Sequence, residues 1–392
     1  LADLARFGLP VVIKADGLAA GKGVIIAETL AERIAAPLTD RAAIERRLAA
    51  VLTEFNAPLK IQELPDPECP QDGVVLRVLA CGVCRSDWHA WNGSDPMPLP
   101  HIPGHEYCGE VIATGARVGR WKVGDRVIAP FILACGQCPD CAAGHQTICA
   151  DQAIPGFTQA GSFAEKIAVP HADHNLTALP EGMDPAHAAA LGCRATTAWH
   201  ALTGRAALAA GEWLAVFGGG GVGASALILG RALGARVVVV DVVREKLDFA
   251  LSLGADAVVD ASREDPAVAV RRLTGGGADV ALEALGIPAT TVPALKSLRK
   301  LGRMVQVGMP AGEHLTMPIP MDAVYSGQLA LFGTRGMPAW RYPSLLALIS
   351  SGRVDLTPLV TRRIALSEAS RELEAFNGPT PPGVAVITDF SR

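Results

Sequence analysis

The feature that most constrains the fold is a glycine-rich turn between two apolar segments at residues 212–241, EWLAVFGGGGVGASALILGRALGARVVVVD. The pattern predicts a strand at 213–217, a turn with Gly218, Gly220 and Gly223, a helix of small residues, and a second strand ending at Asp241. A G-x-G-x-x-G run between strand and helix, with an acid 18 residues after its last glycine, is typical of dinucleotide-binding folds. The alternative, any tight strand–helix turn, is disfavoured by this context.

The residue types in this segment also indicate which dinucleotide is bound. The three glycines let a pyrophosphate approach the helix N-terminus closely. Asp241 is expected to accept hydrogen bonds from the adenosine ribose hydroxyls. Because a carboxylate repels a 2′-phosphate, we expect NAD to be preferred over NADP.

The same alternation of strands and helices continues toward the C-terminus. Three further buried strands are predicted at 255–260, 278–285 and 302–308, with helical stretches between them. Parallel strands that alternate with helices build a doubly wound sheet. The sequence therefore predicts an α/β fold with a Rossmann domain.

Composition excludes several classes of partner. The 392 residues suffice for two domains, half of them are hydrophobic, and the net charge is −4. This charge argues against nucleic acid or an anionic membrane as partner. The apolar stretch 213–240 is interrupted by glycines, Arg231 and Arg236, so no membrane span is expected. With no secretory signal pattern at the N-terminus, we expect a cytoplasmic protein.

A cluster of cysteines predicts a closed metal site. The segment CGQCPDCAAGHQTIC has the spacing C-x2-C-x2-C-x7-C and contains Cys135, Cys138, Cys141 and Cys149. Such short spacings let four thiolates surround one tetrahedral ion, and four sulfurs leave no open position, so the site would be structural. Zinc is favoured, and an iron–sulfur cluster is the alternative. Disulfides are disfavoured because neighbours this close pair poorly.

A second, open metal site is predicted from three separated residues. Cys84 lies in GVCRSDWH, His105 follows 21 residues later in PGHEYCGE, and Cys193 lies in LGCRATTAWHAL. Two thiolates and one imidazole leave the fourth position of zinc free for water or substrate. Each residue alone is more readily explained as part of the core, but the three together with their flanking motifs indicate a catalytic metal.

These motifs resemble, in their order along the chain, those of zinc-dependent alcohol dehydrogenases of the medium-chain dehydrogenase/reductase superfamily. The resemblance extends from about Ala49 to the end of the chain. It implies a mostly-β, GroES-like catalytic domain beside the Rossmann domain. It implies catalytic zinc on Cys84, His105 and Cys193, with Asp87 orienting the histidine and Glu106 tuning the metal.

The resemblance also implies how a proton and the cofactor are handled. Ser86 would take the alcohol proton and His89 would pass it to solvent through the nicotinamide ribose. Arg85 would contact the pyrophosphate, and Lys246 would reach the adenosine ribose beside Asp241. Zinc would stabilise charge on the alcohol oxygen while its carbon gives a hydride to NAD, and the reverse reaction would reduce an aldehyde or ketone.

Three positions refine this resemblance. Cys193 favours simple alcohols, because the similar polyol and threonine dehydrogenases usually have glutamate near this position. Phe131 and Trp91 either line a substrate pocket or are ordinary core aromatics. The family often has an arginine for the pyrophosphate near the C-terminal strand, but this chain has PPGVAVITDF there, and Arg335 is the candidate substitute.

The resemblance implies a domain order and further properties of the protein. We expect an ATP-grasp-like fragment at 1–32, a linker at 33–48, the GroES-like domain at 49–194, the Rossmann domain at 195–332, and the rest of the catalytic domain at 333–392. Two zinc ions per chain, NAD, a small alcohol or aldehyde substrate, and a homo-oligomer (dimer or tetramer) are implied as well.

The N-terminal segment VVIKADGLAAGKGVIIAETL is similar to a different family. It resembles the ATP-grasp segment of phosphoribosylamine–glycine ligase, in which Lys14 and Lys22 would hold ATP. It is not a P-loop, because it is one residue short and lacks the final Ser or Thr. The similarity ends near residue 32, and the second ATP-grasp lobe is missing from the sequence that follows. We therefore expect no ligase activity and interpret the segment as a remnant.

Overall fold

The computed structural model describes residues 11–14, 24–27 and 46–392, and divides the chain into two compact units, Leu1–Arg46 and Arg47–Arg392. In the first unit, β1 (Val11–Lys14) and β2 (Val24–Ala27) pair antiparallel, with Val11 opposite Ala27. The two strands coincide with the apolar runs VVI and VII of the sequence. The loop with Lys22, and most of the ATP-grasp-like segment, lie outside the described residues.

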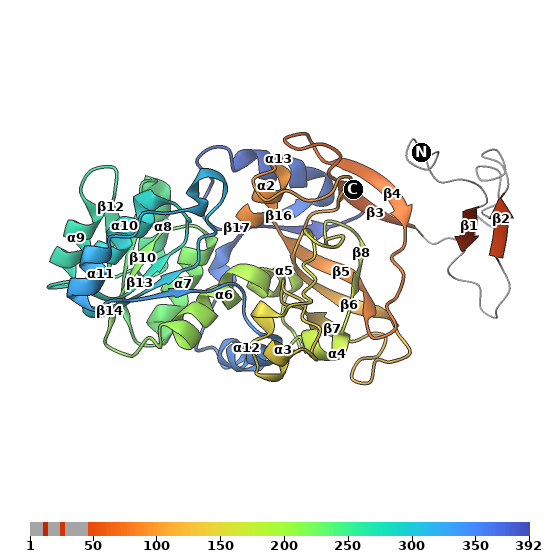
Figure 1. Cartoon of the computed structure of the whole chain (residues 1–392), viewed down its shortest axis with the longest axis horizontal. Helices are drawn as coiled ribbons and strands as arrows, with labels where there is room; N and C mark the ends of the chain where they lie inside the picture. Colours follow the sequence, from red (N-terminus) through yellow and green to blue (C-terminus); the bar gives the residue numbers. More distant parts are fainter. Residues whose placement is uncertain (1–10, 15–23, 28–45) are drawn as a thin grey trace. The chain divides into compact units, whose positions relative to one another are not determined.

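The glycine-rich turn follows strand β10 of a parallel sheet (Figure 1). This sheet has six strands in the order β12-β11-β10-β13-β14-β15. This order is that of the Rossmann fold, so the predicted doubly wound sheet is confirmed. Its strands are β10 (Trp213–Phe217), β11 (Arg236–Asp241), β12 (Ala257–Asp260), β13 (Ala278–Glu283), β14 (Leu298–Gln306) and β15 (Ala330–Gly333). Its helices are α7 (Gly221–Ala232), α8 (Arg244–Ser252), α9 (Pro266–Leu273), α10 (Pro288–Lys296) and α11 (Met321–Gly327).

Both faces of the central strands are buried, which explains their almost uniformly apolar sequences. Leu214 and Val216 of β10 belong to one hydrophobic cluster, whereas Ala215 and Phe217 belong to another. Side chains alternate between faces of a strand, and helices cover both faces of a parallel sheet. The edge strand β12 is less buried than predicted, since only Val259 of its four residues is fully buried.

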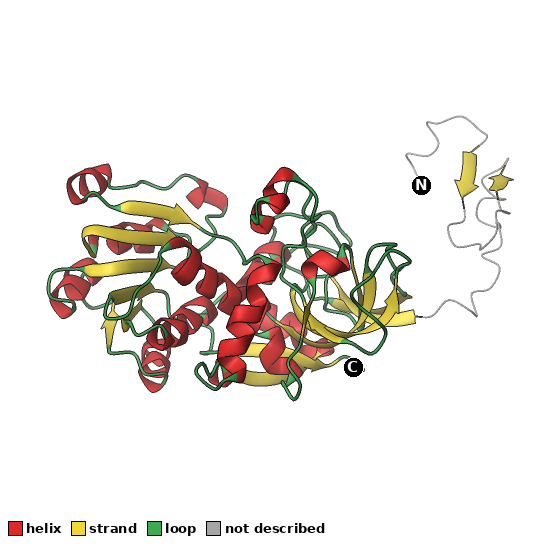
Figure 2. Cartoon of the chain, turned by 90° about the horizontal axis from the view of Figure 1, so that it is seen from below, coloured by secondary structure: helices red, strands yellow, loops and turns green. Residues whose placement is uncertain are grey.

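The other half of the second unit is mostly β, as the GroES-like prediction requires (Figure 2). Its main sheet has the order β16-β17-β5-β6-β7-β9, with β8 also paired to β5, and β3 and β4 form a separate pair. The strands are β3 (Arg46–Val51), β4 (Lys60–Pro65), β5 (Val74–Gly82), β6 (Glu106–Thr114), β7 (Arg126–Ile128), β8 (Lys166–Val169), β9 (Thr177–Ala178), β16 (Val360–Ala365) and β17 (Val384–Asp389). The helices are α2 (Arg85–Trp91), α3 (Pro139–Ala142), α4 (Ala172–Asn175), α5 (Pro185–Ala189), α12 (Tyr342–Ser350) and α13 (Ala369–Ala375). Helix α6 (Thr196–His200) follows α5 and packs in the same hydrophobic cluster as α7.

The C-terminal segment returns to the sheet formed by the first part of the unit. Strand β17 pairs antiparallel with β5, and Ile387 lies opposite Cys81. The main sheet of the mostly-β half is therefore built from two segments of sequence that flank the Rossmann sheet.

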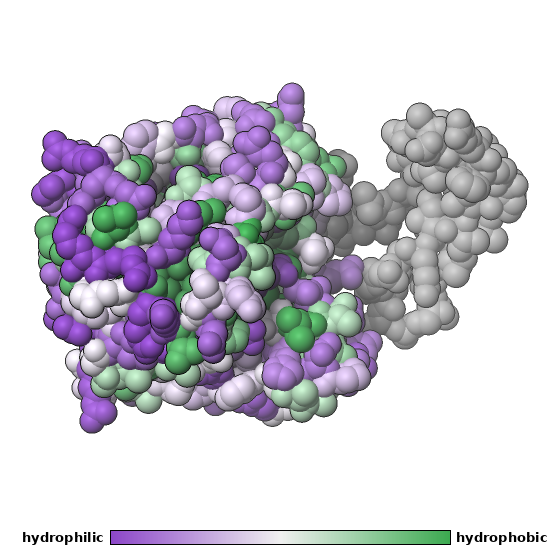
Figure 3. All heavy atoms as spheres, turned by 60° about the vertical axis from the view of Figure 1, so that its left-hand side comes forward, coloured by the Kyte–Doolittle hydropathy of each residue, from purple (hydrophilic) through white to green (hydrophobic). Residues whose placement is uncertain are grey.

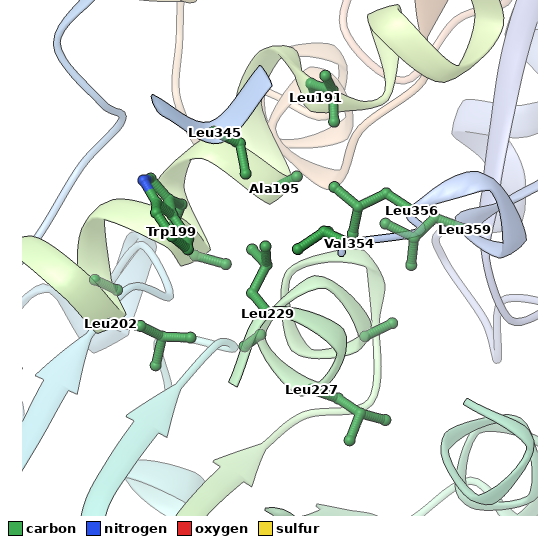
Figure 4. Close-up of a cluster of buried hydrophobic side chains, with 14 of the residues drawn as sticks. Leu191, Ala195, Trp199, Leu202, Leu227, Leu229, Leu345, Val354, Leu356 and Leu359 are labelled. Carbon is green, nitrogen blue, oxygen red and sulfur yellow. The ribbon is translucent and has the colours of Figure 1, made fainter. Parts of the chain in front are cut away.

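A hydrophobic cluster connects the two halves of this unit and anchors the segment that carries Cys193 (Figure 4). Leu191 and Ala195 flank Cys193 and pack in the cluster that also contains Leu227 and Leu229 of α7. Burying such side chains contributes roughly 1.5–3 kcal/mol each, so the position of Cys193 relative to α7 is fixed by packing.

The surface is mixed in character. On the face drawn in Figure 3, hydrophobic residues reach the surface in several separate groups among hydrophilic ones. Among the described residues, no helix combines the length and the apolar character needed to cross a membrane.

Candidate active site and cofactor cleft

The first element of the site is the start of α2. Here the carboxylate of Asp87 accepts hydrogen bonds from two backbone N–H groups and contacts the ring of His105. Cys84 precedes the helix, and its N–H donates to Asp87 Oδ2 at 2.9 Å. Asp87 Oδ1 accepts from Gly104 N at 3.1 Å and lies 2.7 Å from His105 Nδ1. Because Asp87 is fully buried, these bonds fix Cys84 and His105 relative to each other.

His105 presents one ring nitrogen to Asp87 and the other to the metal candidates. Burial alone would disfavour its protonation, but the charge of Asp87 and their hydrogen bond raise the pKa of His105 well above its usual value. Its Nε2 atom is buried and has no hydrogen-bond partner. A buried orphan nitrogen of this kind fits a metal ligand, because metal-bound histidines usually donate their other N–H to a carboxylate or carbonyl.

Cys193 approaches His105 and Cys84 from a different part of the chain. It lies in a π-helical turn, Leu191–Ala195, of the kind often found at functional sites. The ligand atoms of Cys84, His105, Glu106 and Cys193 all lie within 4.8 Å of one another. The hydrogen bond between the two thiols lowers the pKa of Cys84 and raises that of Cys193, so Cys84 is the more acidic thiol of the pair.

Glu106 is also at this centre but has a cationic partner. Its Oε2 lies 3.1 Å from Arg194 Nη2, and both side chains are almost completely buried. Burial raises the pKa of Glu106 to about 8, against the opposing charge of Arg194. The same Arg194 Nη2 donates to Val83 O. Glu106 is thus one of the potential ligands of this group and also contacts the buried guanidinium of Arg194.

The four cysteines of the second cluster converge as their spacing predicted. The ligand atoms of Cys135, Cys138, Cys141 and Cys149 all lie within 4.8 Å of one another. All nine cysteines of the chain fall in the described part, and all are free thiols. Four sulfurs at these separations fit a tetrahedral zinc site with no open position.

The glycine-rich turn forms one wall of a cleft of about 720 Å³ between the Rossmann sheet and the mostly-β half. Gly218, Gly220 and Gly223 line it at the start of α7, where backbone N–H groups point outward. A Cβ at Gly223 would overlap Gly218 O, so only glycine permits this close turn. A Cβ at Gly220 would meet nothing within 4 Å, which leaves room for a ligand beside the helix N-terminus.

The two candidates for the adenosine ribose line the same cleft. Asp241 ends β11, and its Oδ2 accepts from Gly219 N at 2.7 Å, while its Oδ1 accepts from Val243 N at 2.9 Å. Lys246 lies close to the same turn: a Cβ added at Gly219 would be 3.3 Å from Lys246 Cβ. Lys246 also lines the cleft. The carboxylate therefore has a structural role in this turn that the sequence did not indicate.

The remaining candidates lie along α2 but have separate partners. Ser86 Oγ is 3.9 Å from Cys84 Sγ, whereas His89 Nδ1 is 3.0 Å from Ser94 Oγ. Burial and the charge of Arg85 lower the pKa of His89. Arg85 and His89 line the cleft, and the Arg85 guanidinium lies 5.0 Å from the centre of the Trp88 ring.

Of the two aromatic candidates for a substrate pocket, one is in the core and one is at the site. Trp91 is 2% exposed, and its indole N–H donates to Ala57 O at 2.7 Å. The ring of Phe131 lies edge-on to that of His105, with centroids 5.7 Å apart. The guanidinium of Arg335 lies 5.9 Å from the centre of the Phe131 ring, and Arg335 is not among the described residues that line the cleft.

Two buried polar residues that brace the site, besides Arg194, escaped the sequence analysis. Asn175 is 1% exposed and bonds both backbone groups of Ala134, next to Cys135, at 2.8 and 2.9 Å. Glu283 is fully buried and accepts from Gly286 N, in the loop that lines the cleft. A charged or polar residue within an apolar stretch is the sequence signal that could have identified such residues. For example, Arg194 is the only Lys or Arg between Lys166 and Arg205.

Together, the Rossmann sheet, the dinucleotide cleft and the adjoining thiol–imidazole centre define a two-domain, zinc-dependent dehydrogenase. Two family models match the chain: the alcohol dehydrogenase GroES-like domain at residues 70–181 and zinc-binding dehydrogenase at residues 221–351. The chain belongs to the zinc-dependent alcohol dehydrogenase family of the medium-chain dehydrogenases/reductases. It is an oxidoreductase whose cofactors are zinc and NAD.

Individual relatives support this assignment over most of their length. An alcohol dehydrogenase of Geobacillus stearothermophilus is 37% identical over 294 residues, which are 73% of this chain and 85% of the relative. An L-threonine 3-dehydrogenase of Bacillus velezensis is 34% identical over 80% of this chain and 90% of its own. The structure of alcohol dehydrogenase TADH from Thermus sp. ATN1 is similar with a TM-score of 0.81 and 31% identity, covering 87% of this chain and 99% of the other.

Proposed function

We propose that this enzyme oxidises simple alcohols reversibly to aldehydes or ketones with NAD, using a catalytic zinc on Cys84, His105 and Cys193. The observation that carries the proposal is the buried, unpartnered Nε2 of His105, grouped with two thiols beside the dinucleotide cleft. When bound, zinc supplies a Lewis acid for the alcohol oxygen, and NAD supplies a hydride acceptor.

The chain's own residues would orient the reactants and move the proton. Asp87 holds His105 through the 2.7 Å bond, so the imidazole keeps one tautomer. Ser86, next to Cys84, would take the proton of the alcohol hydroxyl. His89, one helical turn further on, would pass it to solvent, and its lowered pKa keeps it neutral and able to accept a proton.

We propose a second, structural zinc on Cys135, Cys138, Cys141 and Cys149, and therefore two zinc ions per chain. The closed, four-sulfur geometry supports a structural role. On the cofactor side, Gly218, Gly220 and Gly223 would accommodate the pyrophosphate with Arg85. Asp241 and Lys246 would bind the adenosine ribose, which supports NAD over NADP.

The domain limits are part of this proposal. Residues 49–194 and 333–392 would form the catalytic domain and 195–332 the Rossmann domain. The pairing of β17 with β5 supports joining the first two segments. Residues 1–32 would be a remnant and 33–48 a linker that take no part in the reaction, and the last residues of this linker, from Arg46, already belong to β3.

We also propose that the protein is cytoplasmic and forms a homo-oligomer. Nine free cysteines, seven of them in metal-binding groups, suit the reducing cytoplasm. Strand β15 is an edge strand of the parallel sheet, so its outer side is open to pairing. Large side chains are also exposed: Tyr325 is 85% exposed and Leu315 is 75% exposed. Both features support a homo-oligomer.

The decisive experiment measures NAD reduction by its nicotinamide absorbance with primary and secondary alcohols and with L-threonine. Metal is quantified on the same samples. We expect turnover with simple alcohols and two zinc ions per chain. Cys193→Ala should lose one zinc and about a thousandfold in kcat while still binding NADH, because several kcal/mol of Lewis-acid stabilisation disappear.

A matched cysteine variant controls for the loss of any thiol. Cys69 lies outside both metal groups, so Cys69→Ala should keep both zinc ions and full turnover. Turnover restricted to L-threonine would overturn the proposed substrate class. Absence of turnover with every alcohol, together with absence of NADH binding, would overturn the proposed function as a whole.

A further inference from the structure

Arg194 is buried between the zinc ligands and the dinucleotide cleft. It follows Cys193 directly, is 6% exposed, and lines the cleft together with Gly218 and Gly220. Its Nη2 is shared between Glu106 Oε2 and Val83 O. The other terminal nitrogen, Nη1, is buried and has no hydrogen-bond partner.

The side chain of Arg194 also lies against the first residue of α7. A Cβ built at Gly221 would overlap Arg194 Cδ, so the glycine leaves the space that the arginine stem occupies. Helix α7 has 12 residues, and its N-terminal N–H groups and dipole favour a phosphate at this end. Arg194 therefore brings a fixed positive charge beside the position where such a helix binds an anion.

The other two arginines that line the cleft are engaged differently. Arg362 Nη1 lies 2.6 Å from both carboxylate oxygens of Glu372, which neutralise it. Arg85 lies 5.0 Å from the Trp88 ring centre and 5.2 Å from that of Phe376. Arg194 differs because an unsatisfied donor of a buried guanidinium is costly and a ligand oxygen would satisfy it.

We infer that Arg194 is a cofactor-binding residue that contacts the diphosphate of the dinucleotide, while its ion pair with Glu106 links the cofactor to the zinc centre. The inference rests on the proposed use of NAD. A guanidinium suits this task because its fork of donors can serve a carboxylate and a phosphate at once. The contact would make the dinucleotide part of the same buried charge network as Glu106.

The test is direct binding, measured without turnover. Affinities for NADH, ADP-ribose and adenosine are determined by nicotinamide fluorescence and by competition with NADH, and zinc is quantified in each sample. Arg194→Gln should weaken NADH and ADP-ribose by the same factor, about tenfold or more, because both contain the diphosphate. Adenosine affinity and the zinc content should stay unchanged, and Arg194→Lys should restore part of the lost affinity.

A second variant tests the same contact from the opposite side and remains informative if Arg194→Gln folds poorly. Gly221→Ala displaces the arginine stem without removing its charge, so it should also weaken ADP-ribose. When combined with Arg194→Gln, it should add little, because the two changes remove one contact. Arg231→Gln on the same helix, whose side chain is 43% exposed and paired with Asp256, is the control and should bind normally.

The outcomes separate this inference from the proposed function. Normal ADP-ribose affinity in both Arg194→Gln and Gly221→Ala would overturn the diphosphate contact while leaving NAD use intact. An equal loss of adenosine affinity, or loss of one zinc, would show that Arg194 acts only as a structural counter-charge for Glu106. A wild-type enzyme that binds neither NADH nor ADP-ribose would overturn the cofactor proposal itself.

Discussion

Asp87 Oδ1 lies 2.7 Å from His105 Nδ1, and both side chains are sealed from solvent. Asp87→Asn keeps the shape but removes the charge that orients and polarises the imidazole. Loss of such a partner typically lowers metal affinity by about 10- to 100-fold. We expect faster zinc loss during dialysis against a chelator, with NADH affinity unchanged.

The control for this variant is Asp248→Asn, which removes a carboxylate that is 55% exposed and paired with Arg244 on α8. It should lose zinc at the wild-type rate. Equal zinc retention in Asp87→Asn and the wild type would show that the bond only positions the ring. Its role in holding the metal would then have to be dropped.

The four-cysteine lobe should contribute stability more than chemistry. Cys138→Ala leaves three sulfurs and removes a closed site, and loss of a structural metal belongs to the changes that cost more than about 4 kcal/mol. We expect one zinc per chain, a lower Tm, and near-normal kcat per folded molecule at low temperature. A Tm equal to that of the wild type, or iron in the purified protein, would contradict the assignment.

Asp241 should set the preference for NAD, but its removal should also cost NAD affinity. The carboxylate bonds the backbone N–H groups of Gly219 and Val243 in addition to its expected contact with the ribose. In Asp241→Ser the repulsion of a 2′-phosphate disappears. The ratio of kcat/KM for NADP to that for NAD should rise by about 10- to 100-fold, which corresponds to roughly 1.5–3 kcal/mol.

Asp260 provides a matched control for this comparison. It ends β12 directly opposite Asp241 in the parallel register, and it forms a turn with Ser262. Asp260→Ser should leave the cofactor ratio unchanged. If the unmutated enzyme used both cofactors with equal kcat/KM, the role of Asp241 in selection would be refuted.

His200 should make stability depend on pH below neutrality. Burial and the charge of Arg341 lower the pKa of His200 from 6.5 to about 4. The unfolded chain therefore binds a proton more readily, so stability is complete above pH 6.5 and falls as pH drops toward 4. Allowing for solvent screening at this half-buried site, the loss is about 1–2 kcal/mol.

His200→Gln should remove this part of the pH dependence, because glutamine can still accept from Arg341 but does not titrate. Urea unfolding at several pH values measures the free energy, and the difference from the wild type is the relevant quantity. His145→Gln, in the exposed loop of the cysteine lobe, is the control. Parallel pH curves for His200→Gln and the wild type would disprove the assignment.

Much of this architecture could be predicted because its signals are local. The glycines from Gly218 to Gly223 and the strands on either side follow from steric needs within about thirty residues. Strand β14 begins at Leu298, before the predicted 302, and includes Leu301 with a positive φ of 61°, an irregularity that no sequence pattern indicated. The four-residue strand β15 is too short to show a period and was not predicted.

The site was less predictable where contacts are distant in sequence. Glu106 and Arg194 pair across 88 residues, and only the folded chain brings them together. The π-helical turn at Cys193 also has no sequence signature, since its dihedral pattern depends on packing around Leu191 and Ala195. The candidate metal ligands could be proposed from the sequence because cysteines and histidines are rarely grouped in this way without function, and the structure brings their ligand atoms together.

The last prediction concerns the N-terminal unit, Leu1–Arg46. A segment of this size buries too little surface to be stable alone, and strand β3 of the dehydrogenase unit begins at Arg46. Deleting residues 1–45 keeps β3 whole, so we expect unchanged kcat, KM, NADH affinity and zinc content. Lys22→Ala in the full chain should likewise change none of these. The interpretation as a remnant fails if the truncated enzyme loses activity, or if the full chain binds ATP tightly and Lys22→Ala abolishes that binding.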